Sequence, residues 1–316
     1  MQCKHYMTHS ARFGAHRALL HIGLTLLGAI LGGPGCDPKP HEAPNATVSS
    51  GATARSPQSA GPSKSVEVVV FAASSLTRPF EALEAEFERA HPFADLVYHF
   101  AGTQELRTQI EQGAPADVLA SADERYMTAL VQSGHVKSPV TFTTNQLVIA
   151  VAPQAKGKIQ TLGDLALPCR LVLGAPEVPV GRYSEIALQK AALSLGQDFP
   201  KRVLGHVISR ELNVKQVLAK VQLGEADAGI VYQSDVSSTS AGVSAVPIPA
   251  EFNVIASYPI AITTHSSSKS LAEAFIALLS SPTGERALSS AGFGPPMKVS
   301  EGAAPSVAGA SRSVSP

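Results

Sequence analysis

The chain has 316 residues, enough for one large domain or two ordinary ones. Its 25 Lys and Arg balance 25 Asp and Glu, so the formal net charge is zero and nothing indicates nucleic acid or an acidic polymer as a partner. Trp is absent and aromatic residues make up 5%, which leaves little material for a sugar-binding or base-stacking platform, and the three cysteines include no CxxC pair, which argues against a zinc ribbon or a thioredoxin-like site.

The N-terminus has the features of an export segment. Basic residues precede the apolar run Ala18 to Leu31, which has the length of a signal peptide rather than of a membrane span. Cys36 then follows small residues, in a pattern that resembles a bacterial lipoprotein cleavage site, although Gly33 stands where that pattern prefers Leu. We therefore expect 1–36 to be a signal peptide of the lipoprotein type with the lipid on Cys36. An ordinary signal peptide cut nearby is the alternative.

Two further segments have the composition of disordered chain. Residues 37–65 and 298–316 are rich in Pro, Ser, Ala, Gly and Thr. We expect the first to be a flexible linker, which would suit a protein held at a membrane by a lipid, and the second to be a disordered tail. The folded part is then about Val66 to Met297.

The folded part begins with a strand, a turn of small residues and a helix. Val68 to Phe71 is apolar and typical of a buried parallel strand, and Ser74 and Ser75 lie in the turn that follows it. One face of the helix is formed by Leu76, Phe80, Leu83 and Phe87. Unpaired N–H groups and the positive end of the helix dipole meet the two hydroxyls there, which predicts an anion site. Alternatively, one of these serines only caps the helix.

Two more units of the same kind follow. The strand Asp95 to Phe100 leads to Thr103, a candidate N-cap, and the strand Ala116 to Ala120 leads to another helix. Three strand–helix units in succession indicate a parallel, doubly wound sheet. Because ligands lie at the carboxyl ends of the strands of such sheets, Ser74, Ser75 and Thr103 are expected on the ligand side.

A second half starts with the strand Leu147 to Val151. The strand Arg170 to Leu173 runs into a turn with two prolines and two glycines, ahead of a helix expected over Ser184 to Leu195. Asn213 should cap the helix that begins with Val214, and a later strand ends at Tyr232. The chain then returns through Tyr258 to Thr263 to two last helices, Lys269 to Leu279 and Thr283 to Ala291.

This order predicts an α/β protein of two lobes. Each lobe would be a mainly parallel sheet flanked by helices, with a ligand cleft between the lobes. We expect the first lobe to hold residues 66–146 plus 258–297 and the second to hold residues 147–257. Two crossing segments, near Gln146 and Tyr258, would form the hinge.

Four stretches in this order resemble the periplasmic molybdate-binding proteins of ABC transporters, the ModA family. They read FAASSLT, FAGTQELRTQIEQGAPADVLASAD, GAPEVPVGRYSEIAL and GEADAGIVYQSD. The likeness runs from about Val66 to Pro295 and implies a class II periplasmic-binding-protein fold. It implies a solute-binding protein that captures molybdate or tungstate and delivers it to the permease of an ABC importer. Such a protein is periplasmic or in the cell envelope, needs no cofactor and is expected to be a monomer.

The resemblance also implies which residues bind the anion. They are two side-chain hydroxyls, two backbone amides and a tyrosine hydroxyl, with one further hydroxyl as an additional candidate: Ser75, Thr103, Val180, Val214, Tyr232 and, additionally, Ser74. These groups would contact the oxyanion oxygens, with no direct ligand to the metal. Thr103 replaces the usual serine and Ser74 stands where alanine is common, so the order of molybdate, tungstate and a smaller oxyanion stays open.

Elementary chemistry agrees with such a site. Molybdate is fully deprotonated at neutral pH and only accepts hydrogen bonds, so its site needs donors and no carboxylate. Arg78 and Arg182 lie near the candidate donors in sequence, either as ligand contacts or as solvated charges at the rim. Thr103 could instead be a simple cap, and Tyr232 a tyrosine at the edge of the core.

Two other functions stay open. The first is a binding protein for another solute, such as sulfate, phosphate or ferric iron; phosphate would want a carboxylate acceptor, and ferric iron several tyrosines or acids together. The second is an enzyme with Ser75 as nucleophile. It would need a base and a third orienting group, and the sequence has neither a GxSxG motif at Ser75 nor a His at an obvious strand end.

Overall fold

A computed structural model of the chain describes residues 65–237 and 242–297. The expected signal peptide 1–36 with Cys36, the linker up to residue 64 and the tail 298–316 lie outside the described residues. In the part that is described, no helix combines the length and the apolar character needed to cross a membrane.

The first strands form the predicted parallel group. β1 (Val66–Ala73) lies between β2 (Ala94–Ala101) and β3 (Val118–Ala120), and both neighbours run parallel to it. Side chains alternate across this sheet. Val68 and Val70 pack into the larger core, whereas Phe71 packs into a second cluster on the opposite face.

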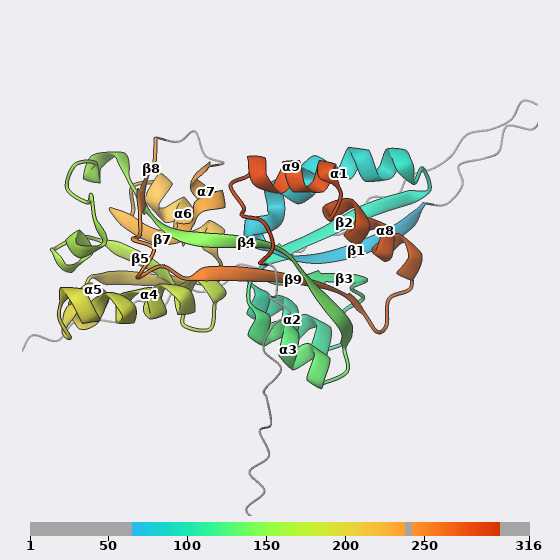
Figure 1. Ribbon diagram of the computed structural model, residues 1–316, viewed down its shortest axis with the longest axis horizontal. Coiled ribbons are helices and arrows are strands. Elements are labelled where there is room, and N and C mark those ends of the chain that lie inside the picture. The colour runs from blue at the N-terminus through green and yellow to red at the C-terminus, as the bar shows by residue number, and fades with distance from the viewer. Residues whose placement is uncertain (1–64, 238–241, 298–316) are drawn as a thin grey trace, which may run out of the picture. The chain divides into compact units, whose positions relative to one another are not determined.

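Helices cover both faces of these strands (Figure 1). One face carries α1 (Thr77–Ala90), α8 (Lys269–Leu279) and α9 (Pro282–Ser290), and the other carries α2 (Thr103–Glu111) and α3 (Glu124–Gln132). The apolar face predicted for α1 is correct, because the side chains at its helical spacing are all at most 1% exposed: Leu76, Phe80, Leu83 and Phe87. We call these strands and helices the first lobe.

Two long antiparallel strands run from the first lobe into a second set of elements (Figure 1). β4 (Val136–Val151) pairs with β9 (Ile255–Thr263) up to Gln146, and from Leu147 onward it pairs with β7 (Ala228–Tyr232) instead. The sheet then continues through β5 (Leu171–Gly174) to β6 (Val207–Glu211), which are parallel to each other, while β8 (Ser244–Pro247) pairs with β4.

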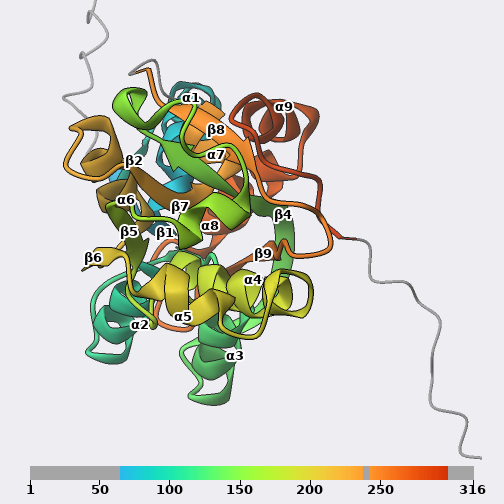
Figure 2. The same cartoon turned by 90° about the vertical axis from the view of Figure 1, so that its left-hand side faces the viewer.

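The second lobe consists of β5 to β8 with their helices. These are α4 (Pro179–Leu195), α5 (Phe199–Leu204), α6 (Val214–Gln222) and α7 (Gln233–Ser237). In both Figure 1 and Figure 2, α4 and α5 lie on the same side of the strands as α2 and α3. α6 lies on the other side of the strands, as α1 does (Figure 1).

The structure corrects several expected elements. The sheets are mixed rather than mainly parallel, because β4 and β9 run antiparallel to their neighbours. α4 begins at Pro179 and not at Ser184, since proline is well suited to the first helical position. The short helices α5 and α7 and the first eleven residues of β4 were not expected. Predicted and observed bounds agree for Lys269–Leu279.

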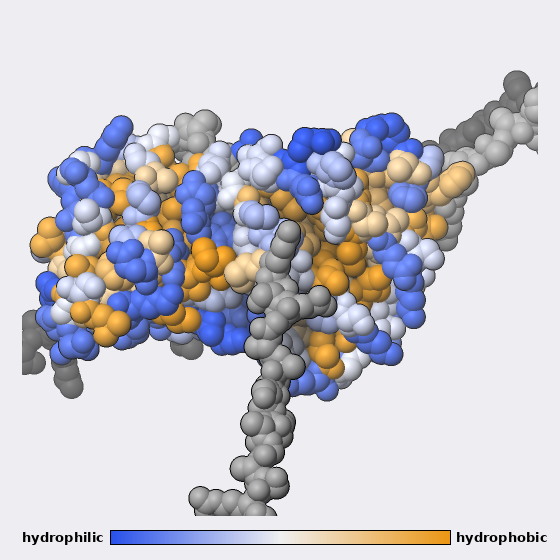
Figure 3. All heavy atoms as spheres, viewed as in Figure 1, coloured by the Kyte–Doolittle hydropathy of each residue, from blue (hydrophilic) through white to orange (hydrophobic). Residues whose placement is uncertain are grey.

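The face of the molecule in Figure 3 shows hydrophilic and hydrophobic residues interspersed. The most exposed large apolar side chains of the described residues are Leu193 at 83% on α4 and Leu223 at 73% just after α6. The two residues are far apart in sequence, and single exposed apolar side chains of this kind are normal on protein surfaces.

An ion pair holds the start of β7, and it predicts a pH-dependent contribution to stability. Asp227 accepts hydrogen bonds from the Arg170 guanidinium at 2.7 Å and from the Arg170 backbone N–H at 2.8 Å, and these bonds lower the pKa of its carboxyl group. The stabilisation is therefore present above the ordinary pKa of about 4 and is lost as the pH falls through the lowered value. We expect Asp227→Asn to cost about 1 kcal/mol of unfolding free energy at pH 7.

Urea titrations of both proteins at pH 7 and at pH 3 measure this effect. The difference between them should shrink in acid, because at pH 3 the Asp227 carboxyl of the unfolded chain, with its ordinary pKa, is largely protonated. A difference that stays the same at both pH values would contradict the assignment.

Candidate functional site

One small cavity lies where the two lobes meet. The space that it leaves for the centre of a water molecule is about 10 Å³. We call it the central cavity, and its wall is built from five turns and the end of β7: Ala73, Ser74, Ser75, Ala101, Gly102, Thr103, Ala122, Val178, Pro179, Val180, Asn213, Val214 and Tyr232. All six candidate binding residues lie on this wall, three from the first lobe and three from the second.

Ser74 and Ser75 form a tight turn between β1 and α1. They are 6% and 3% exposed, and neither side chain caps a helix, so the capping alternative does not describe them. The Ser75 Oγ instead lies 2.9 Å from the hydroxyl oxygen of Tyr258. The Ser74 carbonyl accepts a bond from Thr77 Oγ1 at 2.8 Å, which fixes the turn.

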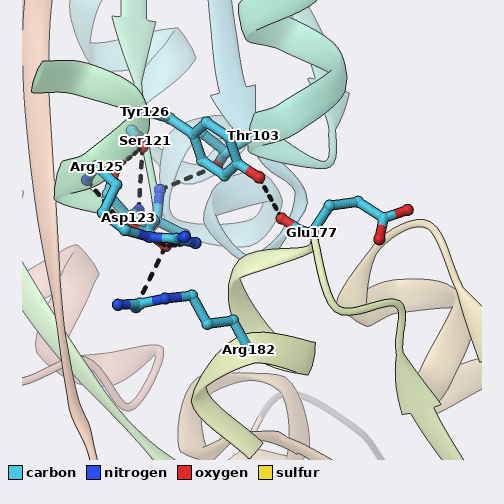
Figure 4. Close-up of polar contacts among 8 residues, drawn as sticks. Thr103, Ser121, Asp123, Arg125, Tyr126, Glu177 and Arg182 are labelled. Atoms are coloured by element: carbon cyan, nitrogen blue, oxygen red, sulfur yellow. Dashed lines mark hydrogen bonds and ion pairs between the residues drawn. The ribbon is translucent and has the colours of Figure 1, made fainter. Parts of the chain in front are cut away.

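Thr103 is the first residue of α2, and Gly102 occupies the N-cap position. The expected capping role of Thr103 is therefore wrong. Its Oγ1 accepts a hydrogen bond from the Ala122 N–H at 3.1 Å, across the turn that follows β3 (Figure 4). Because that N–H fills one lone pair, the hydroxyl proton is free to point into the central cavity.

Two helix N-termini of the second lobe complete the wall. Val180 lies in the first turn of α4 and Val214 is the first residue of α6, and the Asn213 side chain caps α6 as expected, accepting from the Gln216 N–H at 3.1 Å. The first N–H groups of a helix have no acceptor within it and carry a partial positive charge. The side chains of Val180 and Val214 are buried, so only their N–H groups can serve a ligand.

Gly181 allows α4 to start so close to β5. A Cβ at this position would lie 2.1 Å from the Ala175 carbonyl oxygen and 2.4 Å from that of Gly174. Such distances are shorter than any packing contact, so the first turn of α4 is where it is because residue 181 has no side chain.

Tyr232, the last residue of β7, supplies the least satisfied group of the wall. It is 2% exposed, and its hydroxyl has no hydrogen-bond partner among the described residues. Leaving a buried hydroxyl unpaired costs about 1–3 kcal/mol. Burial also raises the pKa of Tyr232 well above its ordinary value, so the group is a neutral donor. An unpaired buried donor at a cavity indicates a ligand that accepts hydrogen bonds.

The wall of the central cavity contains no charged side chain from the described ranges. The nearest acid in sequence, Asp123, follows Ala122, but its carboxylate lies 2.7 Å from the Arg125 guanidinium and 3.7 Å from that of Arg182. Arg182 therefore pairs with Asp123 and does not line the central cavity. Arg78 is exposed to solvent and does not line it either. Residues 65–237 and 242–297 hold no cluster of three or more His, Cys, Asp and Glu that could hold a metal ion.

Beside the central cavity, side chains of the first lobe contact the second (Figure 4). The Tyr126 hydroxyl donates to the Glu177 carbonyl oxygen, in the turn before α4. Arg182 of α4 faces Asp123, and Gln104 Nε2 donates to the Leu212 carbonyl oxygen at 2.8 Å. These contacts join the lobes around the turns that supply the donors.

One residue of the site was missed from the sequence. Tyr258 is fully buried on β9 and lies behind the wall, yet its hydroxyl reaches Ser75 across 183 positions. Burial is the main cause that raises its pKa, so it too stays neutral. No local pattern marks it, because its position depends on the pairing of β9 with β3 and β4.

Comparisons with known proteins agree with this geometry. Residues 68–294 match the family model described as "Bacterial extracellular solute-binding protein". The chain is 35% identical over 252 residues to the molybdate-binding protein ModA of Mycobacterium tuberculosis. The aligned region covers 79% of this chain and 93% of that protein.

Solved structures give the same fold. The periplasmic molybdate-binding protein of Azotobacter vinelandii matches with a TM-score of 0.64 at 23% identity, covering 73% of this chain and all of that one. The sulfate-binding protein SubI of M. tuberculosis matches with a TM-score of 0.64 at 18% identity, covering 72% and 86%. At these identities the likeness shows the two-lobed fold alone. From the family model and the ModA relative together, the chain belongs to the bacterial extracellular solute-binding proteins.

Proposed function

We propose that this protein captures molybdate or tungstate between its lobes and delivers it to the permease of an ABC importer. The observation that carries the proposal is the donor set of the central cavity. The hydroxyls of Ser75, Thr103 and Tyr232 and the helix N-termini at Val180 and Val214 come together on a wall without charged side chains. Ser74 lies on the same wall as a further donor.

This donor set suits a fully deprotonated tetrahedral anion. Hydrogen bonds to a charged acceptor are about twice as strong as neutral ones, and helix N-termini add partial positive charge without an Arg or Lys. A protonated anion such as hydrogen phosphate would need an acceptor for its proton. The described residues of this wall include no Asp or Glu carboxylate that could accept that proton.

The size of the central cavity excludes bulky solutes. Its open space corresponds to about one water-sized sphere, which is too little for a sugar or a peptide. A tetrahedral oxyanion is larger than water, so a slight separation of the lobes must accompany its entry. An anion bonded by both lobes then favours the closed arrangement over the open one.

We assign residues 66–146 plus 258–297 to the first lobe, residues 147–257 to the second, and the hinge to the crossing segments near Gln146 and Tyr258. The exchange of strand partners along β4 between Gln146 and Leu147 supports this division. The protein acts as a monomer without a cofactor, in the periplasm or the cell envelope. Export by 1–36 and a lipid on Cys36 would place it beside the permease.

Two other functions fit the site less well. Sulfate is also a deprotonated tetrahedral dianion, and a solved sulfate-binding protein shares the fold, so sulfate is the second candidate. An enzyme with Ser75 as nucleophile is disfavoured because the partner of Ser75 is the neutral Tyr258 hydroxyl rather than a general base.

Competition calorimetry with the full chain tests the ligand. Molybdate should bind with one anion per chain, tungstate should displace it, and sulfate should compete only at higher concentration. Binding heat with sulfate and none with molybdate would refute the named ligand. Ester hydrolysis that disappears in Ser75→Ala would instead favour the enzyme.

The contacts of Figure 4 predict how fast the ligand leaves. Arg182 pairs with Asp123 across the lobes, so Arg182→Gln should destabilise the closed state and speed molybdate release about two- to fivefold, with little change in the association rate. Arg125→Gln is the matched control, because Arg125 contacts the same carboxylate from within the first lobe, whether the lobes are open or closed. Stopped-flow exchange against tungstate measures both. Equal release rates for the two variants would contradict a role in closure.

A further inference from the structure

We propose that Tyr258 is a positioning residue for the oxyanion: its hydroxyl donates to the Ser75 Oγ from behind the wall, so that the Ser75 proton points into the central cavity. This inference rests on the proposed function and goes beyond it, because it assigns the preference for deprotonated anions to a residue that does not touch the ligand.

The geometry holds the two hydroxyls together. Their oxygens are 2.9 Å apart, with Ser75 3% and Tyr258 0% exposed. The Tyr258 ring is fixed edge-on by two neighbours, Tyr232 with centroids 6.0 Å apart and Phe293 with centroids 5.4 Å apart. The hydroxyl therefore cannot turn away from Ser75 to find water.

The direction of the bond follows from the number of protons. The hydroxyls of Ser75 and Tyr258 each have a single proton to donate. Because the proposed function assigns the Ser75 proton to the anion, the bond between the two hydroxyls must be donated by Tyr258.

Thr103 has the same arrangement on the other side of the central cavity. There the Ala122 N–H donates to Oγ1 at 3.1 Å. Ser75 and Thr103 are thus each supplied with a donor from behind and turn their own protons towards the ligand. The proton of a protonated anion would face hydrogen-bond donors and find no acceptor. Because a buried polar group without a partner is costly, the site disfavours such an anion.

The test is calorimetry with molybdate and with phosphate near neutral pH. Tyr258→Phe should weaken molybdate binding about tenfold, the value of one hydrogen bond to the site. It should also reduce the preference for molybdate over phosphate, because a released Ser75 hydroxyl can rotate and accept a proton. In a Ser75→Ala background, Tyr258→Phe should cause no further loss, since Tyr258 acts through Ser75.

Tyr98→Phe is the matched control. It removes a tyrosine hydroxyl that donates to the Phe80 carbonyl oxygen at 3.0 Å, in the first lobe and off the wall of the central cavity. It should leave both affinities unchanged. If Tyr258→Phe proves too unstable to assay, neutron diffraction of the unmodified protein with molybdate decides instead: the Tyr258 proton should lie towards Ser75 Oγ, and a Ser75 proton that lies towards Tyr258 would overturn the inference.

Three results would overturn the inference. They are equal affinities in Tyr258→Phe and Tyr98→Phe, an unchanged preference over phosphate, and losses from Ser75→Ala and Tyr258→Phe that simply add. Failure of the proposed function looks different, because the unmodified protein itself would then not bind molybdate.

Discussion

Replacing Gly181 with alanine is expected to weaken molybdate binding severely while the protein still folds. The added Cβ would lie 2.1 Å from the Ala175 carbonyl oxygen and 2.4 Å from that of Gly174, both of which are backbone atoms that cannot swing aside. The first turn of α4 must then move away from β5, and it takes the Val180 N–H with it. Losing a charge-assisted hydrogen bond and displacing a helix N-terminus should together weaken binding by about 100-fold or more.

The control for Gly181 is another glycine of the second lobe. A Cβ on Gly163 would have its nearest neighbour at 3.5 Å, an ordinary contact, so Gly163→Ala should bind molybdate normally. Calorimetry measures the affinities, and thermal melting separates lost binding from lost folding, because overpacking of this kind costs about 1–3 kcal/mol. A folded Gly181→Ala protein with unchanged affinity would show that α4 does not contribute to the site.

Substitutions at Thr103 should cause the second large loss of molybdate affinity, and two different substitutions there serve as test and control. Thr103→Val keeps the shape of the side chain but removes the hydroxyl that would donate to the anion. It also leaves the Ala122 N–H without its acceptor. We expect molybdate affinity to fall about 10- to 100-fold, the range for a hydrogen bond to a charged group. Thr103→Ser keeps the hydroxyl and should bind within about threefold of the unmodified protein.

Titrations of both Thr103 variants with molybdate and sulfate decide between donation and shape. If the valine variant binds as tightly as the serine variant, the hydroxyl is not a ligand donor. A change in the order of molybdate and sulfate in the serine variant would instead assign a sieving role to the methyl group of Thr103.

The turns that form the wall could be predicted because their signals are local. A hydroxyl at the end of a buried strand, as at Ser75, and a cap such as Asn213 depend on neighbours in sequence. Strand–helix order also placed residues from both halves at one cleft. Ser75 and Thr103 were thereby assigned to the ligand side, where the structure finds them on one wall.

What the sequence could not predict depends on distant pairing. The segment from Val136 to Gln146 is mixed in polarity and contains Pro139, and it becomes a strand only because β9 lies beside it. Two prolines and two glycines suggested a loop up to Tyr183, whereas Pro179 starts a helix. The partners of Ser75 and Asp123, namely Tyr258 and Arg182, come from elements far along the chain, and no spacing rule relates them.

The most direct measurement is the position of molybdenum in crystals grown with molybdate, located by its anomalous scattering. We predict a single strong peak in the central cavity, with the surrounding oxygens in hydrogen-bond contact with the side chains of Ser75, Thr103 and Tyr232 and the amides of Val180 and Val214. A peak elsewhere on the protein, or an Asp or Glu carboxylate turned towards the metal, would contradict the account.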